Sequence, residues 1–232
     1  MPRRPSAIDR APIRGFTLVE MSVVLVVIAL IAGAVTVGRD VYRAAAAERI
    51  GSDFVQAWVL AYDQYVAGSG GVPGDDFDDP SGQVNDSIGS FLCDDALLDE
   101  MLARGITLPA GRAEGANDRY VYQDGRGVPH ELRACFGAVQ WAEPYGSVGN
   151  YASRPRNVLR LEGLTPELAT LLEARIDGRV DALHGRFREA GEQAANTATG
   201  GPWSLQSDDT MGGGTDPDDQ VAELTGYIRM NQ

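Results

Sequence analysis

Hydrophobic and polar residues are divided unevenly along this chain. Residues 21–37, MSVVLVVIALIAGAVTV, contain no charged residue, whereas the parts on either side of them are polar. From Phe16 to Gly38 the segment is long enough to cross a bilayer core of about 30 Å as a helix. One carboxylate, that of Glu20, lies near its start, although a charge is costly inside a bilayer. The pattern therefore predicts a membrane-spanning helix with one acidic residue that requires an explanation.

Beyond the apolar segment the pattern becomes amphipathic. Apolar residues recur at spacings of three and four, which places them on one face of a helix. No proline occurs between Phe16 and Val72, so the helix can continue out of the span. We predict one long helix that ends at Val66, whose second part, residues 39–66, packs into a core through Ala47, Ile50, Phe54, Trp58, Tyr62 and Tyr65.

The remaining residues, 67–232, are predicted to form a globular head that mixes helices and strands. Residues 67–82 are rich in Gly, Pro and Asp and read as a loop. Apolar spacing predicts helices at 90–105 and 165–178. Strands are predicted where β-branched and aromatic residues gather, at 119–124, 132–142, 157–163 and 221–230. The expected fold class is α+β, with the long N-terminal helix packed on a small antiparallel sheet.

The net charge of the chain indicates which classes of partner it is expected to bind. The formal net charge is −13, and all 20 basic residues are arginines. Nucleic-acid binding needs basic patches that replace counterions around phosphates, so no nucleic-acid partner is predicted. An acidic, mutually repelling surface fits exposure outside the cytoplasm.

The sequence contains no motif typical of a nucleophilic or a metal-dependent enzyme. His130 and His184 are far apart in sequence, and the chain contains no G-x-S-x-G, P-loop, H-E-x-x-H or CxxC motif. We therefore predict no catalytic residue and no enzymatic activity. The two cysteines, Cys93 and Cys135, both follow the apolar segment, where an oxidising compartment permits a disulfide between them; two buried free thiols are the alternative.

The residues before the apolar segment set its orientation. They carry one acid, Asp9, against the basic residues Arg3, Arg4, Arg10 and Arg14. Positive charge before a first apolar segment holds that end in the cytoplasm, so the chain after Gly38 is expected to be translocated. A cleaved secretory signal is one interpretation, with RAAAAE at 43–48 as its processing site, but the apolar stretch is too long and begins with Thr17 and Glu20. A plain membrane anchor is a second interpretation, and it leaves Glu20 unexplained.

The third interpretation comes from GFTLVE, residues 15–20. A basic leader, a glycine, Phe, Glu and an uninterrupted apolar run occur here in the order that resembles the prepilin cleavage and methylation motif of type IV pilins and type II secretion pseudopilins. The resemblance implies that a prepilin peptidase cuts between Gly15 and Phe16 and that Phe16 becomes the N-methylated first residue. Cleavage creates an ammonium on Phe16, and we expect Glu20 of a neighbouring subunit to neutralise it and so to favour one assembly register.

Two segments of the head resemble elements of one group of prepilin-like proteins. YVAGSGGVPGD resembles the Y-x-x-x-PGD element that follows the long helix there, with extra glycines in the spacing. GLTPELATLLEARIDGRVDALHG, residues 163–185, resembles L-(S/T)-P-E-x-A followed by ID-x-KIDDG, but it lacks the second aspartate and the proline-containing turn. Within it, Thr165 is predicted to be an N-cap and Pro166 the first helical residue.

Two acidic loops, residues 74–82 and 207–219, offer oxygen ligands of the kind that Ca²⁺ prefers. The second resembles the calcium loop near the C-terminus of the major pseudopilin of type II secretion, although it lacks the intermediate glycines. The resemblance makes the candidate ligands Asp208, Asp209, Asp216 and Asp218. A solvated run of charge is the commoner alternative, and no other cofactor is predicted.

Together these features predict a structural subunit of a type IV pilus or a type II secretion pseudopilus. The subunit is expected to be a minor pilin or a minor pseudopilin. The expected partners are prepilin peptidase, other pilin or pseudopilin subunits and the inner-membrane assembly platform. The precursor is expected to be a single-pass inner-membrane protein with an extracytoplasmic head, which then enters a filament. Its predicted divisions are a leader, a membrane and filament-core helix, an amphipathic helix and a head, at 1–15, 16–38, 39–66 and 67–232. The alternative is a membrane-tethered extracytoplasmic binding or sensor protein that uses the helix only as an anchor.

Overall fold

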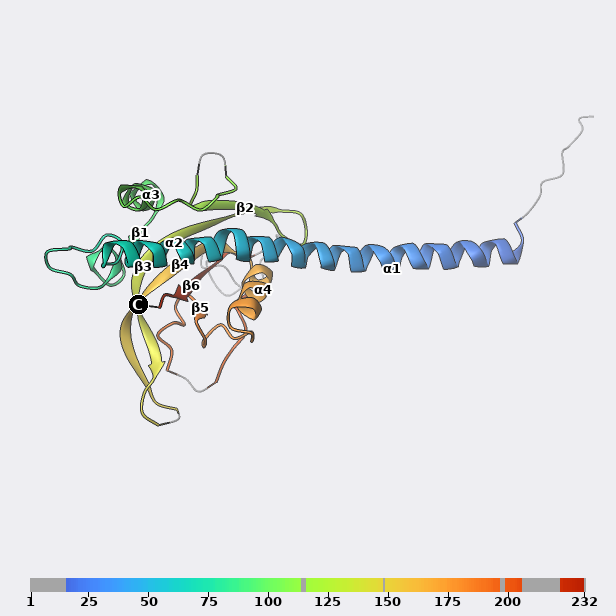
Figure 1. Cartoon of the computed structure of the whole chain (residues 1–232). Coiled ribbons are helices and arrows are strands. Elements are labelled where there is room, and N and C mark those ends of the chain that lie inside the picture. Colours follow the sequence, from blue (N-terminus) through green and yellow to red (C-terminus); the bar gives the residue numbers. More distant parts are fainter. Residues whose placement is uncertain (1–15, 114–115, 148, 197–198, 206–221, 232) are drawn as a thin grey trace, which may run out of the picture. The chain divides into compact units, whose positions relative to one another are not determined.

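The structure is a computed structural model, which describes residues 16–113, 116–147, 149–196, 199–205 and 222–231 (Figure 1). The chain divides into two compact units, residues 1–43 and 44–232. The described part of the first unit is almost entirely helical. The second unit contains a layer of helix, a sheet and the loops that join them.

The long helix is built from three consecutive segments. They are α1 (Leu18–Arg49), the π-helix η1 (Ile50–Val55) and α2 (Gln56–Ser69). Gly70 ends the run in the left-handed conformation, with φ of 77°, and its N–H donates to the carbonyl of Val66 at 2.9 Å. A left-handed glycine is the common stop signal of a helix, and here it places the end beyond the predicted Val66.

The π-helical segment lies where α4 (Pro166–Ile176) packs against the long helix. A Cβ on Gly51 would come within 3.1 Å of Arg175 Cδ and 3.3 Å of Leu172 Cδ2, so the glycine permits this close approach. The carbonyl of Glu48 accepts hydrogen bonds from Ser52 Oγ at 2.9 Å and from Arg175 Nη1 at 3.3 Å. The local widening of the helix is therefore supported by side chains from both elements.

The sheet of the second unit has six strands in the described residues, and all their pairings are antiparallel. The strands are β1 (Phe91–Leu92), β2 (Arg119–Gln123), β3 (Pro129–Pro144), β4 (Tyr151–Leu164), β5 (Phe187–Glu189) and β6 (Leu224–Arg229). Their order is β1-β3-β4-β6-β5, and β2 pairs with the first part of β3. A short 3₁₀ turn, η2 (Val84–Asp86), and the helix α3 (Asp94–Ala103) precede β2. The predicted α+β class is confirmed.

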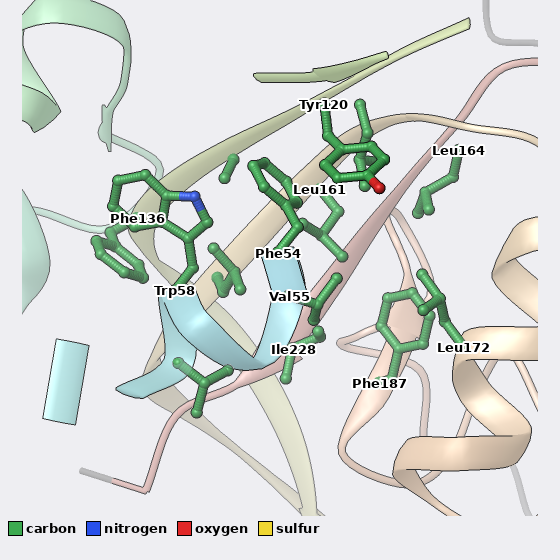
Figure 2. Packing of buried hydrophobic residues seen from close by; sticks show 14 of the residues in the cluster. Phe54, Val55, Trp58, Tyr120, Phe136, Leu161, Leu164, Leu172, Phe187 and Ile228 are labelled. Carbon is green, nitrogen blue, oxygen red and sulfur yellow. The ribbon is translucent and has the colours of Figure 1, made fainter. Parts of the chain in front are cut away.

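The core lies between the long helix and one face of the sheet (Figure 2). Phe54, Val55 and Trp58 project from the helix toward Phe136, Tyr120 and Ile228 on the strands. The Trp58 ring meets the Phe136 ring edge-on, with centroids 5.8 Å apart, an arrangement that aromatic pairs favour. Every residue of the predicted apolar face is buried, namely Ala47, Ile50, Phe54, Trp58, Tyr62 and Tyr65. The helical periodicity therefore located this part of the core correctly.

The structure corrects the predicted start of the helix at 90–105. Phe91 and Leu92 form β1 instead, and the helix begins at Asp94. Phe91 is opposite Gly137 on β3, where a Cβ would lie only 2.3 Å from the Phe91 ring. A tertiary contact with a distant glycine therefore overrides the local helical pattern.

Candidate processing and assembly site

The N-terminal helix carries the only long apolar surface that the described first unit presents. Residues Leu18–Val35 have a mean hydropathy of 2.7, and none of this window is buried within the structure. Large side chains such as Leu25 and Leu30 are 67% and 68% exposed. By length and composition this is a helix able to cross a membrane. Burial within the structure begins only at Ala47, near the end of α1, and continues along one face of η1 and α2.

Glu20 closes a capping box at the start of α1. Thr17 precedes the first helical residue, and its Oγ1 accepts a hydrogen bond from Glu20 N–H at 3.2 Å. In return, Glu20 Oε2 accepts hydrogen bonds from Thr17 N–H and Thr17 Oγ1, each at 2.8 Å. Such reciprocal bonds satisfy backbone donors that the first turn of a helix leaves unpaired.

We did not predict this role of Glu20, although the sequence contains the signal for it. T-x-x-E before an apolar run is the capping-box pattern, with Thr17 and Glu20 in the two required positions. Glu20 thus has a partner within its own chain before any neighbouring subunit is considered. Phe16 is highly exposed, and Gly15, the other side of the predicted cleavage, lies outside the described residues.

In the head, Cys93 and Cys135 form a disulfide with their Cα atoms 4.6 Å apart. The bond joins the residue before α3 to the middle of β3, and Cys135 is fully buried. Closing a loop across 42 residues stabilises a fold by roughly 4 kcal/mol in a chain-entropy description. The disulfide therefore fixes the start of α3 to β3.

The aspartate of the PGD element closes the loop that follows the long helix. Asp75 is buried, and its carboxylate accepts hydrogen bonds from Ser81 N–H, Ser81 Oγ and Gly82 N–H at 2.9–3.0 Å. Burial acts to raise the pKa of Asp75, but these donors outweigh it and hold the pKa below its usual value. Gly74 has φ of 73° and lies against the backbone of Asn85, which explains the glycine before this aspartate.

In the 163–185 segment, as in the loop of Asp75, polar side chains accept hydrogen bonds from backbone N–H groups. Thr165 is the N-cap of α4, accepting from Leu168 N–H at 3.3 Å, and Pro166 opens the helix, as predicted. Asp177 accepts from the N–H groups of Arg186 and Phe187 at 2.9–3.0 Å. These carboxylates shape turns, so the segment keeps its fold without the missing second aspartate.

Glu173, at the end of α4, is fully buried and has two donors. Its Oε1 accepts from Asp181 N–H at 2.6 Å, and its Oε2 accepts from the indole N–H of Trp203. Burial raises the pKa of this carboxyl, while the two donors act in the opposite direction. The residue holds the chain before β5 against α4.

The two histidines, His130 and His184, contact different acidic residues. His130 is buried, with Nδ1 2.9 Å from Glu223 Oε1 and Nε2 3.5 Å from Asp124 Oδ2. His184 Nδ1 lies 3.3 Å from Asp181 Oδ2. Among the described residues, no group of three or more His, Cys, Asp or Glu side chains is arranged to hold a metal ion. The calcium candidates Asp208, Asp209, Asp216 and Asp218 lie outside the described residues.

Comparison with known proteins bears on the N-terminal region. A family model described as the prokaryotic N-terminal methylation motif matches residues 10–36. No curated protein and no solved structure matches the chain. The matched residues include the predicted cleavage site, the capping box and most of the exposed apolar helix. Residues 10–36 of the chain therefore carry the prokaryotic N-terminal methylation motif, which is the prepilin-type motif of type IV pilins and pseudopilins.

Proposed function

We propose that this protein is a minor structural subunit of a type IV pilus or a type II secretion pseudopilus. Prepilin peptidase cuts it after Gly15 and methylates Phe16, and the assembly platform of the inner membrane then polymerises it through its N-terminal helix. The observation that carries the proposal is the methylation motif at 10–36, joined to a helix whose apolar window has no buried residue. So large an apolar surface requires lipid or neighbouring helices to cover it.

The geometry around Glu20 supports a role in assembly. Both Thr17 donors bind Glu20 Oε2, which leaves Oε1 without a hydrogen bond from the described residues. We propose that Oε1 receives the Phe16 ammonium of a neighbouring subunit after cleavage. Pairing removes the cost of two isolated charges in the membrane, so subunits assemble in the register that brings the two groups together.

Mass spectrometry of the purified protein tests processing. Co-expressed with prepilin peptidase, the chain is expected to begin at Phe16 and to carry one added methyl group. Gly15→Val is the matched control and is expected to retain residues 1–15. A chain that keeps these residues, or is cut near Ala47, would exclude a prepilin.

Three variants separate the charge of Glu20 from its capping role. Glu20→Gln keeps the acceptor oxygen of the capping box but loses the charge, whereas Thr17→Ala loses the hydroxyl but keeps the charge. With ammonium pairing, Glu20→Gln and Glu20→Ala are both processed yet fail to enter sheared filaments, and Thr17→Ala assembles. If Glu20→Gln assembles as well as wild type, the pairing hypothesis is wrong and capping is the function of the residue.

Filament isolation distinguishes a subunit from a tethered binding or sensor protein. A subunit is expected to co-purify with filaments sheared from cells that also express the assembly platform. A protein that uses the helix only as an anchor remains entirely in the membrane fraction, whatever its N-terminus.

A further inference from the structure

The hairpin formed by the end of β3 and the start of β4 extends beyond the other strands of the sheet (Figure 1). The pairing of β1 and β2 with β3 reaches no further than Gly137, and β6 pairs with β4 only from Val158 onward. Residues 139–144 and 151–156 therefore pair with each other and with no third strand among the described elements. We call this two-stranded segment the arm.

One face of the arm carries more arginine than acid. Arg154 and Arg156 are two residues apart on β4, so their side chains leave the strand on the same face. Arg229 reaches that face from the end of β6, where it and Arg156 share the carboxylate of Glu143. The side chains of Arg156 and Arg229 nevertheless remain 33% and 37% exposed. Since a guanidinium has five N–H donors, both can accept a further anionic partner.

Arg154 is the most accessible cation of this face. It is exposed and forms no ion pair with a described residue; its guanidinium lies over the ring of Tyr145, 5.9 Å from the centroid. Tyrosine and arginine are the residue types that dominate the energetics of protein interfaces. We call Tyr145, Arg154, Arg156 and Arg229 the arm surface. With Glu143 included it has a formal excess of two positive charges, on a chain whose net charge is −13.

The loop that follows the long helix has the opposite charge. Asp76, Asp78 and Asp79 are exposed, and none of them forms an ion pair with a described residue. The base of this loop is closed by Asp75, whose carboxylate accepts hydrogen bonds from Ser81. Because the loop is already closed, little ordering entropy is lost when its carboxylates bind a partner. We call residues 76–79 the acidic loop.

We infer that the arm surface of one copy of this chain binds the acidic loop of a second copy. Arg154 and Arg156 donate charge-assisted hydrogen bonds to the carboxylates of that loop. The net charge favours this arrangement, since two copies repel each other unless surfaces of opposite sign meet. The two surfaces differ, so each copy keeps one of them available after a contact, and contacts can repeat from copy to copy. The inference does not depend on cleavage at Gly15, so it stands or fails independently of the proposed function.

The absence of lysine from this chain permits a specific test. Arg154→Lys keeps the positive charge and introduces the only side-chain amine of the protein. Carbodiimide joins an amine directly to a carboxylate that it contacts. The full uncleaved chain is placed in phosphatidylcholine vesicles, which concentrate the heads at one surface. With isotopically heavy and light copies mixed, mass spectrometry is expected to find position 154 of one copy joined to the acidic loop of the other.

Arg179→Lys is the matched control for this cross-link. Arg179 is an exposed arginine that follows α4 and lies outside the arm. Its variant is expected to yield at least fivefold less cross-link to the acidic loop than Arg154→Lys. Equal yields from the two variants would overturn the inference. So would cross-links spread over other acids, or cross-links confined to the loop of the same copy.

A charge exchange tests the same contact without chemical coupling. Energy transfer between dye-labelled copies in vesicles is expected to fall severalfold in Arg154→Glu and in Asp78→Arg. Both positions are exposed, so the head keeps its fold in each variant. Mixing the two variants pairs the introduced glutamate with the introduced arginine and is expected to restore the signal. Transfer that is unchanged in the single variants, or not restored in the mixture, contradicts the contact.

Salt and cells provide the last controls. The transfer signal of the wild type is expected to fall when the salt concentration rises from about 50 to about 500 mM, because exposed charges are then screened. In cells, an amine at position 154 that joins a different protein and never a second copy would assign the arm surface to that protein and overturn the inference.

Discussion

The N-terminal and C-terminal parts of the long helix use apolar residues in opposite ways. In the window Leu18–Val35 none of the helix is buried, whereas Phe54 and Trp58 farther along are completely buried. Both parts are apolar and helical, so neither composition nor secondary structure distinguishes them. The difference is that the sheet of the head covers one part, and the described chain provides no cover for the other.

This contrast shows where the stability of each part originates. The buried part contributes to the head through aromatic contacts such as those of Trp58 and Tyr62 with Phe136. The exposed part gains stability only when lipid or neighbouring helices replace water around it. Substitutions in the two parts should therefore separate head stability from membrane insertion and assembly.

The largest expected effect comes from truncating a buried aromatic side chain of the helix. Trp58→Ala should lower the unfolding free energy of the head by about 3–5 kcal/mol, because it leaves a cavity under the sheet. Leu25→Ala, in the exposed part, is expected to leave this quantity unchanged. Urea unfolding in detergent, followed by near-ultraviolet circular dichroism, measures both. Equal losses in the two variants would remove the distinction between the two parts.

Removing the disulfide should be nearly as costly for the head. Cys93→Ala with Cys135→Ala is expected to lower the unfolding free energy by roughly 2–4 kcal/mol, since the unfolded chain regains the freedom of a long loop. The apolar helix has no covalent link of this kind, so insertion of the double variant into membranes should be normal. A double variant as stable as wild type would mean that the disulfide adds nothing beyond the packing around β3.

Acid should weaken the head through Glu143. Arg156 donates to both carboxylate oxygens at 2.7 and 2.8 Å, and Arg229 donates to Oε1 at 2.7 Å. The hydrogen bonds and charge of Arg156, helped by Arg229 and opposed by burial, lower the pKa of Glu143 to about 2. Because the folded pKa lies below the unfolded one, this stabilisation is present above about pH 4.5 and is lost as the pH falls toward 2.

The expected contribution at neutral pH is roughly 2–3 kcal/mol. The difference in unfolding free energy between wild type and Glu143→Gln should therefore be largest at pH 7 and shrink toward pH 2. Other carboxylates titrate in both proteins, so the difference isolates Glu143. A difference that does not vary with pH would contradict the assignment.

The smallest effect distinguishes two glycines of the long helix. Gly51 lies against Arg175 and Leu172, whereas nothing lies within 4 Å of a Cβ placed on Gly33. Gly51→Val should overpack the contact with α4 and cost about 1–3 kcal/mol in the unfolding free energy of the head. Gly33→Val should leave that value unchanged. A neutral Gly51→Val would show that α4 moves away without cost.

Much of the fold was accessible from local pattern. Spacings of three and four identified the buried face of the helix, and segments rich in β-branched and aromatic residues located the strands β2, β3, β4 and β6. The short strands β1 and β5 were missed because each depends on pairing with distant residues. Phe91 enters a strand only because Gly137 opposite has no side chain.

The burial of Asp118 also could not be predicted from the sequence. Nothing in the surrounding residues marks Asp118 as buried, since acids are usually solvated. Its burial and its unpartnered oxygen arise where the chain before β2 meets α3 and β3. The capping box, in contrast, was readable in the sequence, because both Thr17 and Glu20 belong to one helical turn.

The sequence by itself determined the N-terminal part of this protein. The motif is contiguous in sequence: it consists of a basic leader, Gly15, Phe16, Glu20 and an unbroken apolar run. A contiguous segment can bind an enzyme or insert into a membrane without a folded head. Only the tertiary structure decided where α3 begins, which carboxylates bind backbone donors and which acid is left buried without one. These outcomes depend on residues far apart in sequence, whose proximity is set by strand register and helix packing.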